Sequence, residues 1–166
     1  MTKGRITLAM LLLMALSLLV LSACSGQTSA QGTAGPAVAK QTLIKSQISG
    51  DSVSIPQNNV DKYTNTRFKV GTATGELTFM AYNYNNKLYV RADICPPCRS
   101  ESFTLNKGTL VCDSCGTVFD AQNGSGIKGA CVRYPKQEVS YQITGGNIVM
   151  KGIDLTTAYQ NTMRPK

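Results

Sequence analysis

Histidine is absent from the 166 residues of this chain. Its absence excludes zinc sites that use histidine, and it excludes Ser-His-Asp and Cys-His catalysis. It also removes the side chain that usually changes its charge near neutral pH. Charge is sparse too: 16% of residues are charged, the formal net charge is +8, and no run of basic residues exceeds two. Such scattered charge is typical of a solvated surface and does not indicate nucleic-acid binding.

The N-terminus is typical of an exported lipoprotein. Lys3 and Arg5 precede a mostly apolar run of fifteen residues, 6–20, which is short for a bilayer core of about 30 Å and suits a secretory signal. The run ends in Leu-Ser-Ala-Cys at positions 21–24, which resembles a bacterial lipobox. This resemblance implies a lipoprotein signal peptide at residues 1–23 and lipidation of Cys24. We therefore expect a lipid anchor in the bacterial cell membrane, with the protein on the extracytoplasmic face.

Residues 24–41 are predicted to form a lipidated, flexible tether. They contain no aromatic residue and only Val38 among the larger aliphatic residues, so they bury too little apolar surface to offset the entropy lost on ordering.

The membrane, reached through the lipid anchor, is one expected partner. A redox or iron-transport protein of the cell envelope is a second, and nucleic acid is not expected.

Residues 42–166 are expected to form one domain with its own core. Leu77, Phe79 and Ala81 share one face of an alternating segment, and a second alternating segment covers residues 88–94. Asn85-Asn86 between them can adopt the positive φ angles of a tight hairpin turn. This stretch therefore predicts a β-hairpin that ends just before the first cysteine of the domain.

The rest of the domain also has the pattern of a small β protein. Short apolar or alternating stretches, separated by glycine or asparagine, predict strands near residues 51–56, 108–112, 117–121, 138–144 and 147–153. Only residues 155–163 predict a helical turn. There is no alternation of strands with helices. The sequence predicts an all-β fold, a small antiparallel β-sandwich or barrel, in addition to the N-terminal signal helix.

Five cysteines remain after Cys24, an odd number that argues against a framework made only of disulfides. Four of them form two C-x-x-C pairs, Cys95 with Cys98 and Cys112 with Cys115, and 13 residues lie between the pairs. Each pair can wrap one side of an ion or cluster, so two facing turns complete a site of four thiolates. The spacing indicates a metal without deciding which one.

The cysteine pairs and their surroundings resemble the family of membrane iron-sulfur containing proteins called FtrD-like, over about residues 51–153. The positions that match the pattern of this family are Asp93, Cys95, Cys98, Val111, Cys112, Cys115, Gly116, Gly129, Cys131 and Pro135. The resemblance implies an iron–sulfur domain, sometimes found with ferrous-iron uptake systems. Around Cys131 the chain has Gly-Ala-Cys-Val-Arg-Tyr-Pro in place of the usual Gly-Gly-Cys-Asn-Pro, which makes Cys131 a less secure ligand.

The order of the motifs also looks like that of Rieske proteins, with both histidine positions replaced by cysteine. This likeness implies two cysteine knuckles of the Rieske or zinc-ribbon kind on the β fold. Thiolates in place of neutral imidazoles add negative charge to a [2Fe–2S] cluster. Its potential is then expected near the plant-ferredoxin value of about −400 mV.

Three functions are compatible with the cysteines. The first is iron–sulfur or iron binding by Cys95, Cys98, Cys112 and Cys115, with Cys131 as a further candidate, for electron transfer or iron handling. The second is a structural zinc site in a binding module. The third is a thiol-disulfide protein, which export allows, although the βαβ setting of thioredoxin is missing. The first reading requires no substrate pocket, so an enzyme is not expected.

Overall fold

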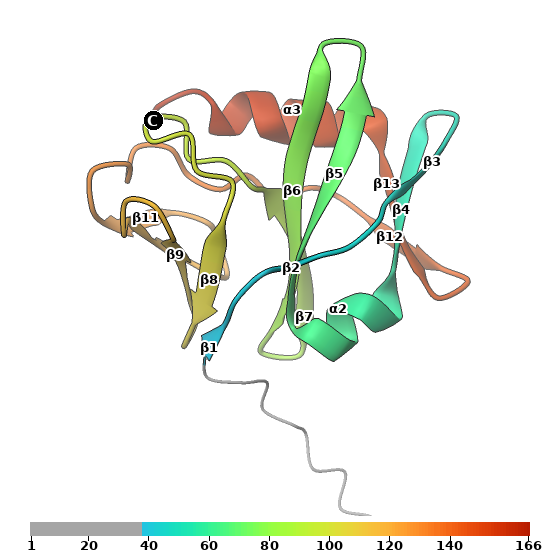
Figure 1. Ribbon diagram of the computed structural model, residues 1–166, viewed down its shortest axis with the longest axis horizontal. Helices are drawn as coiled ribbons and strands as arrows, with labels where there is room; N and C mark the ends of the chain where they lie inside the picture. The colour runs from blue at the N-terminus through green and yellow to red at the C-terminus, as the bar shows by residue number, and fades with distance from the viewer. Residues whose placement is uncertain (1–37) are drawn as a thin grey trace, which may run out of the picture. The chain divides into compact units, whose positions relative to one another are not determined.

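A computed structural model describes residues 38–166 of the chain (Figure 1). The predicted signal peptide and its helix, Cys24 and residues 24–37 of the predicted tether lie outside the described residues. No helix among residues 38–166 is long and apolar enough to span a membrane.

The described part contains thirteen short strands and two helices. In chain order these elements are β1 (Val38–Ala39), β2 (Thr42–Leu43), β3 (Gln47–Ser49), β4 (Ser52–Pro56), α2 (Gln57–Tyr63), β5 (Asn65–Thr72), β6 (Gly75–Tyr84), β7 (Lys87–Ala92), β8 (Phe103–Asn106), β9 (Thr109–Cys112), β10 (Val118–Asp120), β11 (Gly126–Lys128), β12 (Gln142–Thr144), β13 (Asn147–Lys151) and α3 (Gly152–Thr162).

The strands form three sheets. The first has the order β1-β8-β9-β10-β11, the second β2-β5-β6-β7 and the third β12-β13-β4-β3. All paired strands are antiparallel except β2 and β5, which are parallel. The predicted all-β, antiparallel fold class is confirmed.

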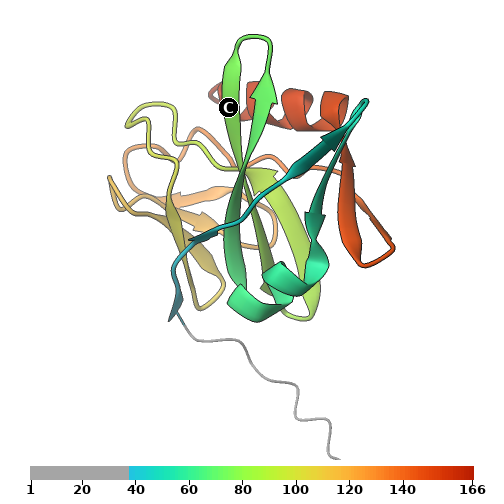
Figure 2. The ribbon, with the colours of Figure 1, turned by 45° about the vertical axis from the view of Figure 1, so that its right-hand side comes forward.

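The β6–β7 hairpin lies between two hydrophobic cores. The predicted turn is present, with φ angles of 49° at Asn85 and 58° at Asn86. Phe79 and Ala81 face one core, as expected from the alternation, but Met80 and Tyr82 on the opposite face are buried as well. Figures 1 and 2 show the β8–β9 hairpin on one side of the β5–β6 hairpin and the β3–β4 hairpin on the other. The central sheet therefore has no solvent-facing side along this stretch.

The two cores differ in composition. The core beside β4 and α3 is aliphatic and aromatic, and it includes Val53, Ile55, Phe68, Phe79, Val90, Ile148, Met150 and Leu155. The core beside the β8–β9–β10 sheet includes Tyr82, Phe103, Leu110 and Phe119, together with Cys95, Cys112 and Cys131. Three of the five cysteine side chains are thus buried parts of a hydrophobic core.

One boundary and one helix differ from the sequence-based expectation. Residues 38–41 belong to the folded part and not to the tether, because β1 pairs with β8 and Gln41 Nε2 donates a 2.9 Å hydrogen bond to Asp93 Oδ2. Helix α2 was not predicted. It begins after Pro56, whose fixed φ suits a helix start, and it buries only Val60, so its sequence has no apolar periodicity.

Arg91 connects β7 to the segments that follow β10. Its side chain is 1% exposed and donates hydrogen bonds to the Tyr82 hydroxyl and to the carbonyls of Lys136 and Gln122. It also pairs with Glu138 at 3.0 Å. The chain continues from β7 directly to the first cysteine pair. The Arg91 guanidinium therefore holds the end of β7 against residues near 122 and near 136–138.

Replacing Arg91 with leucine leaves these acceptors unpaired in a buried place. We expect the free energy of unfolding to fall by about 3 kcal/mol. Urea denaturation followed by circular dichroism measures this change. The matched control is Arg164→Leu at an exposed position, for which a change below about 0.5 kcal/mol is expected. Equal stability of the two variants would contradict a clamping role for Arg91.

Candidate metal centre

The two C-x-x-C pairs lie in turns with the same backbone closure. In the first cysteine turn, residues 95–100, the Cys95 amide donates to the Ser100 carbonyl at 2.8 Å. In the second cysteine turn, residues 112–117, the Cys112 amide donates to the Thr117 carbonyl at 2.9 Å. The fifth residue of each turn has a left-handed conformation, φ 56° at Arg99 and 68° at Gly116. The glycine has little steric cost there, whereas Arg99 adopts a conformation unusual for its residue type.

Strand pairing brings the two cysteine turns together. The first turn leads into β8, and the second joins β9 to β10. In the β8–β9 register Phe103 lies opposite Cys112, and the Asp113 amide donates to the Ser102 carbonyl at 3.0 Å. The end of the first turn therefore lies beside the start of the second.

The sulfur atoms of all five cysteines form one cluster. Sγ of Cys95 lies 3.9 Å from Sγ of Cys115, and Sγ of Cys98 lies 3.7 Å from Sγ of Cys112. Each of these short pairs combines one sulfur from each turn. Sγ of Cys131 lies 3.8 Å from Sγ of Cys115. Every cysteine that the sequence predicted as a ligand or further candidate therefore lies at one place.

The spacing of the sulfurs fits thiolate coordination. Metal–sulfur bonds of about 2.3 Å in a tetrahedral site place neighbouring sulfurs about 3.8 Å apart. Four sulfurs, those of Cys95, Cys98, Cys115 and Cys131, all lie within 4.8 Å of one another. Cys112 lies outside this set of four but remains 3.7 Å from Cys98. The donor set is thus suitable for a four-thiolate centre and contains one thiol more than such a centre uses.

Cys131 is held in the cluster through Thr117. The buried Thr117 hydroxyl lies 3.2 Å from Cys115 Sγ and accepts a 3.2 Å hydrogen bond from the Cys131 amide. Gly129 passes close to the same residue, with φ 118°, and an added Cβ there would lie 2.7 Å from the Thr117 hydroxyl oxygen. Only glycine allows this approach, which explains why a glycine stands two residues before Cys131.

Burial and hydrogen bonds affect the thiols differently. Burial raises the pKa of Cys95 and also that of Cys112, although the amides of Cys115 and Ser114 act to lower the latter. The small burial of Cys115 acts to raise its pKa, but hydrogen bonds from Thr117 and from neighbouring thiols lower it to about 6. Burial thus favours the proton on Cys95 and Cys112, which a bound metal would replace, whereas the hydrogen bonds at Cys115 favour its thiolate.

The cluster has a buried side and an accessible side. Cys95, Cys112 and Cys131 are buried, whereas Cys98 is partly exposed and Cys115 is exposed. The accessible sulfurs come from different turns, so both turns contribute to the edge that solvent reaches.

Several residues around the cluster were missed by the sequence analysis. Thr117 and Ser100 occupy equivalent positions, and each hydroxyl contributes a hydrogen bond that lowers the pKa of a cysteine in the second turn. Their common spacing, five residues after the first cysteine of each turn, was the available signal. Lys136 was missed as well, whereas Asp93 was named as a position of the family pattern, and both side chains are fully buried near the cluster. Burial raises the pKa of Asp93 well above its usual range and lowers that of Lys136 to about 8.

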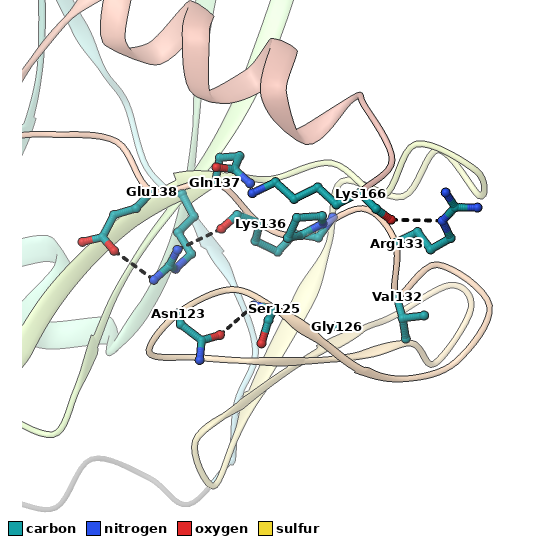
Figure 3. Close-up of a pocket in the computed structure, with 11 residues that line it drawn as sticks. Asn123, Ser125, Gly126, Val132, Arg133, Lys136, Gln137, Glu138 and Lys166 are labelled. Atoms are coloured by element: carbon teal, nitrogen blue, oxygen red, sulfur yellow. Dashed lines mark hydrogen bonds and ion pairs between the residues drawn. The ribbon is translucent and has the colours of Figure 1, made fainter.

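A pocket of about 550 Å³ is lined in part by Lys136 and its neighbours (Figure 3). Its lining includes Arg91, Asn123, Arg133, Glu138 and Lys166 and contains no cysteine. The polar groups in it bind one another, as the dashed lines from Glu138, Lys136 and Arg133 show. No cysteine sulfur therefore lines this pocket.

The fold and the cluster together define a small β protein with a multi-thiolate metal centre. The sequence profile described as membrane iron-sulfur containing protein FtrD-like matches residues 60–161. This match covers more than half of the chain, so the chain belongs to that family, as the resemblance predicted. Family membership and the cysteine cluster support binding of an iron–sulfur centre.

No curated protein matches the chain. Among solved structures, a chain from the complex of reduced oxygenase and oxidized ferredoxin in carbazole 1,9a-dioxygenase has a TM-score of 0.51 and 15% identity. The match covers 63% of this chain and 95% of that one. The plasma membrane Rieske protein PetC3 from Synechocystis PCC 6803 gives 0.43 and 21%, with 58% and 94% covered. The Sphingomonas yanoikuyae B1 ferredoxin gives 0.40 and 17%, with 45% and 74% covered. The first likeness shows a shared fold.

Replacing Gly129 with alanine tests the packing that positions Cys131. The new methyl group would overlap Thr117, so we expect the free energy of unfolding to fall by about 1–3 kcal/mol and the metal content per chain to fall with it. Urea denaturation and elemental analysis measure the two effects. Gly145→Ala is the control, because Gly145 also has a positive φ but has no atom near its Cβ position. Equal effects in both variants would mean that backbone strain, and not contact with Thr117, is responsible.

Proposed function

We propose that the protein is an exported, lipid-anchored electron carrier of the bacterial cell envelope. Its iron–sulfur cluster is held by Cys95, Cys98, Cys112 and Cys115, and Cys131 is a fifth thiol beside it. The cluster supplies a one-electron redox couple when it is bound. The chain supplies the thiolates, the amide and hydroxyl donors around them, and a hydrophobic core on the buried side.

One observation carries the proposal: the sulfur cluster is buried on one side and reaches the surface through Cys98 and Cys115. A redox centre with an exposed edge can exchange electrons with a docked protein without a substrate cavity. The partner is accordingly a redox or iron-transport protein that faces the same side of the membrane.

The sulfur spacing also favours a second candidate, a structural zinc ion. Four sulfurs within 4.8 Å of one another suit a single tetrahedral ion as well as a cluster. Such a protein would be colourless and would lose stability when zinc is removed. Family membership weighs towards iron.

Single cysteine-to-serine variants, purified without oxygen, test the ligand set. We expect Cys95→Ser and Cys112→Ser to lower bound iron and acid-labile sulfide at least about tenfold, because each removes one of four ligands. Cys131→Ser is the matched control, also buried, and is expected to keep its iron with a changed visible spectrum. Iron and sulfide analysis together with absorption before and after dithionite measures these outcomes.

The opposite pattern would correct the assignment. If Cys112→Ser keeps iron and Cys131→Ser loses it, the ligands are the compact set of Cys95, Cys98, Cys115 and Cys131. If the unmodified protein contains zinc and no sulfide, the structural-zinc candidate replaces the electron carrier.

The lipid anchor is tested separately from the metal centre. Cys24→Ser removes the acceptor thiol, so we expect no incorporation of a labelled fatty acid and transfer of the protein out of the membrane fraction. Iron content of the variant should be unchanged, since Cys24 lies outside the domain that holds the five other cysteines. Ser25→Ala is the control for sequence changes at the processing site. Fatty-acid labelling of Cys24→Ser at the level of Ser25→Ala would refute lipidation at this residue.

A further inference from the structure

Lys136 is a fully buried lysine in the core that contains the cysteines. Its side chain is 0% exposed, and Nζ donates a hydrogen bond to the carbonyl of Ile94, the residue before Cys95. Nζ also lies 4.5 Å from the ring centre of Phe119 and 5.2 Å from that of Phe103. The ammonium group is therefore enclosed by two aromatic rings and the start of the first cysteine turn.

No carboxylate forms an ion pair with this ammonium group. Within the part of the chain that the structure describes, the ion pairs are Lys69–Glu76, Lys87–Glu138 and Arg91–Glu138. Asp93, the buried acid of this core, accepts a hydrogen bond from Gln41 instead. Lysine is rarely buried completely without a paired charge, because removing an ammonium group from water costs several kcal/mol. Asp93 therefore acts on this ammonium group only at longer range and not through an ion pair.

The buried thiols are the other groups that can provide negative charge here. Cys95 follows the residue whose carbonyl binds Nζ, and Cys112 lies opposite Phe103 in the β8–β9 register. Both sulfurs therefore belong to the same enclosed region as the ammonium group. When a metal binds, these thiols lose their protons, and four thiolates around one ion or cluster leave net negative charge in a core of low polarity.

The backbone holds Lys136 in this position from both sides. Its amide donates to the Gly124 carbonyl at 2.8 Å, and its carbonyl accepts a 2.8 Å hydrogen bond from Arg91, shown as a dashed line in Figure 3. A charge held so firmly needs little rearrangement when the charge of the centre changes, which is a requirement for tuning a redox site.

We propose that Lys136 is the buried counter-cation of the thiolate centre, where its ammonium group offsets the negative charge of the sulfur ligands and so increases metal affinity and favours the reduced state. The proposal rests on the proposed function in one respect, that the five-cysteine cluster is the site where metal binds. It adds a positioning residue outside the cysteine motifs, with a role that depends on charge.

The test compares four variants of the full-length chain purified without oxygen. Lys136→Gln keeps a hydrogen-bond donor but loses the charge, Lys136→Met loses both, and Lys136→Arg keeps the charge. Lys128→Gln removes an exposed lysine three residues before Cys131 and is the matched control. Binding of Cd²⁺ is measured by its sulfur-to-metal absorption in competition with a chelator, and the midpoint potential is measured on protein that contains iron.

We expect Lys136→Gln and Lys136→Met to bind Cd²⁺ about tenfold more weakly and to lower the equilibrium constant for one-electron reduction by about tenfold, which is about 59 mV. Lys136→Arg and Lys128→Gln should stay within about threefold of the unmodified chain. Lys136→Gln should weaken Cd²⁺ binding by the same factor in a chain that also carries Asp93→Asn, if the thiolates and not Asp93 balance the positive charge of Lys136.

Three results would overturn the proposal. The loss of Cd²⁺ affinity caused by Lys136→Gln could disappear in the Asp93→Asn background, in which case Asp93 and not the thiolates balances the lysine. Lys136→Gln or Lys136→Met could match Lys128→Gln in both Cd²⁺ affinity and potential, in which case the charge has no effect on the centre. Lys136→Arg could lower Cd²⁺ affinity and midpoint potential as much as Lys136→Gln does, in which case the shape of the side chain and not its charge affects the centre. Cd²⁺ binding needs no iron, so a chain without an iron–sulfur cluster would refute the proposed function while the Cd²⁺ comparison still decides the role of Lys136.

Discussion

Repulsion between closely spaced sulfurs is the constraint on which the cysteine-bearing part of this protein depends. Neighbouring sulfurs lie 3.7–3.9 Å apart. Two negative charges at 4 Å repel by about 4 kcal/mol even at an effective dielectric constant of about 20. Several of these sulfurs can therefore be negatively charged together only around a cation. Burial raises the pKa of Cys95 and favours its proton, so a bound metal is what removes the proton of this buried thiol and adds negative charge to the cluster.

The fold holds the closely spaced sulfurs in place by using one turn geometry twice. In both cysteine turns the first cysteine donates its amide to the carbonyl five residues later, and a hydroxyl stands at that later position. Pairing of β8 with β9 then fixes one turn beside the other. Thr117 adds Cys131 to the cluster through its hydroxyl. The remaining strands, including those beyond the central β6–β7 hairpin, form the framework from which these turns extend.

Local patterns predicted much of the fold and the cysteine set, whereas long-range contacts were not predictable. The Asn85-Asn86 hairpin, the antiparallel class and the family follow from alternation, turn chemistry and motif spacing. Helix α2 was missed because it buries a single residue, and residues 38–41 were assigned to a tether because strand β1 is short and its pairing is distant in sequence. Lys136 could not be found, because nothing near it in the sequence indicates burial. Which four cysteines are ligands stays a prediction.

Iron K-edge X-ray absorption of the full-length protein, purified without oxygen from cells, tests the central claim most directly. The account predicts iron with sulfur as its nearest neighbours and a second shell of iron, as a cluster bridged by inorganic sulfide requires. Zinc surrounded by four sulfurs, or a metal-free protein with its domain cysteines in disulfides, would contradict it.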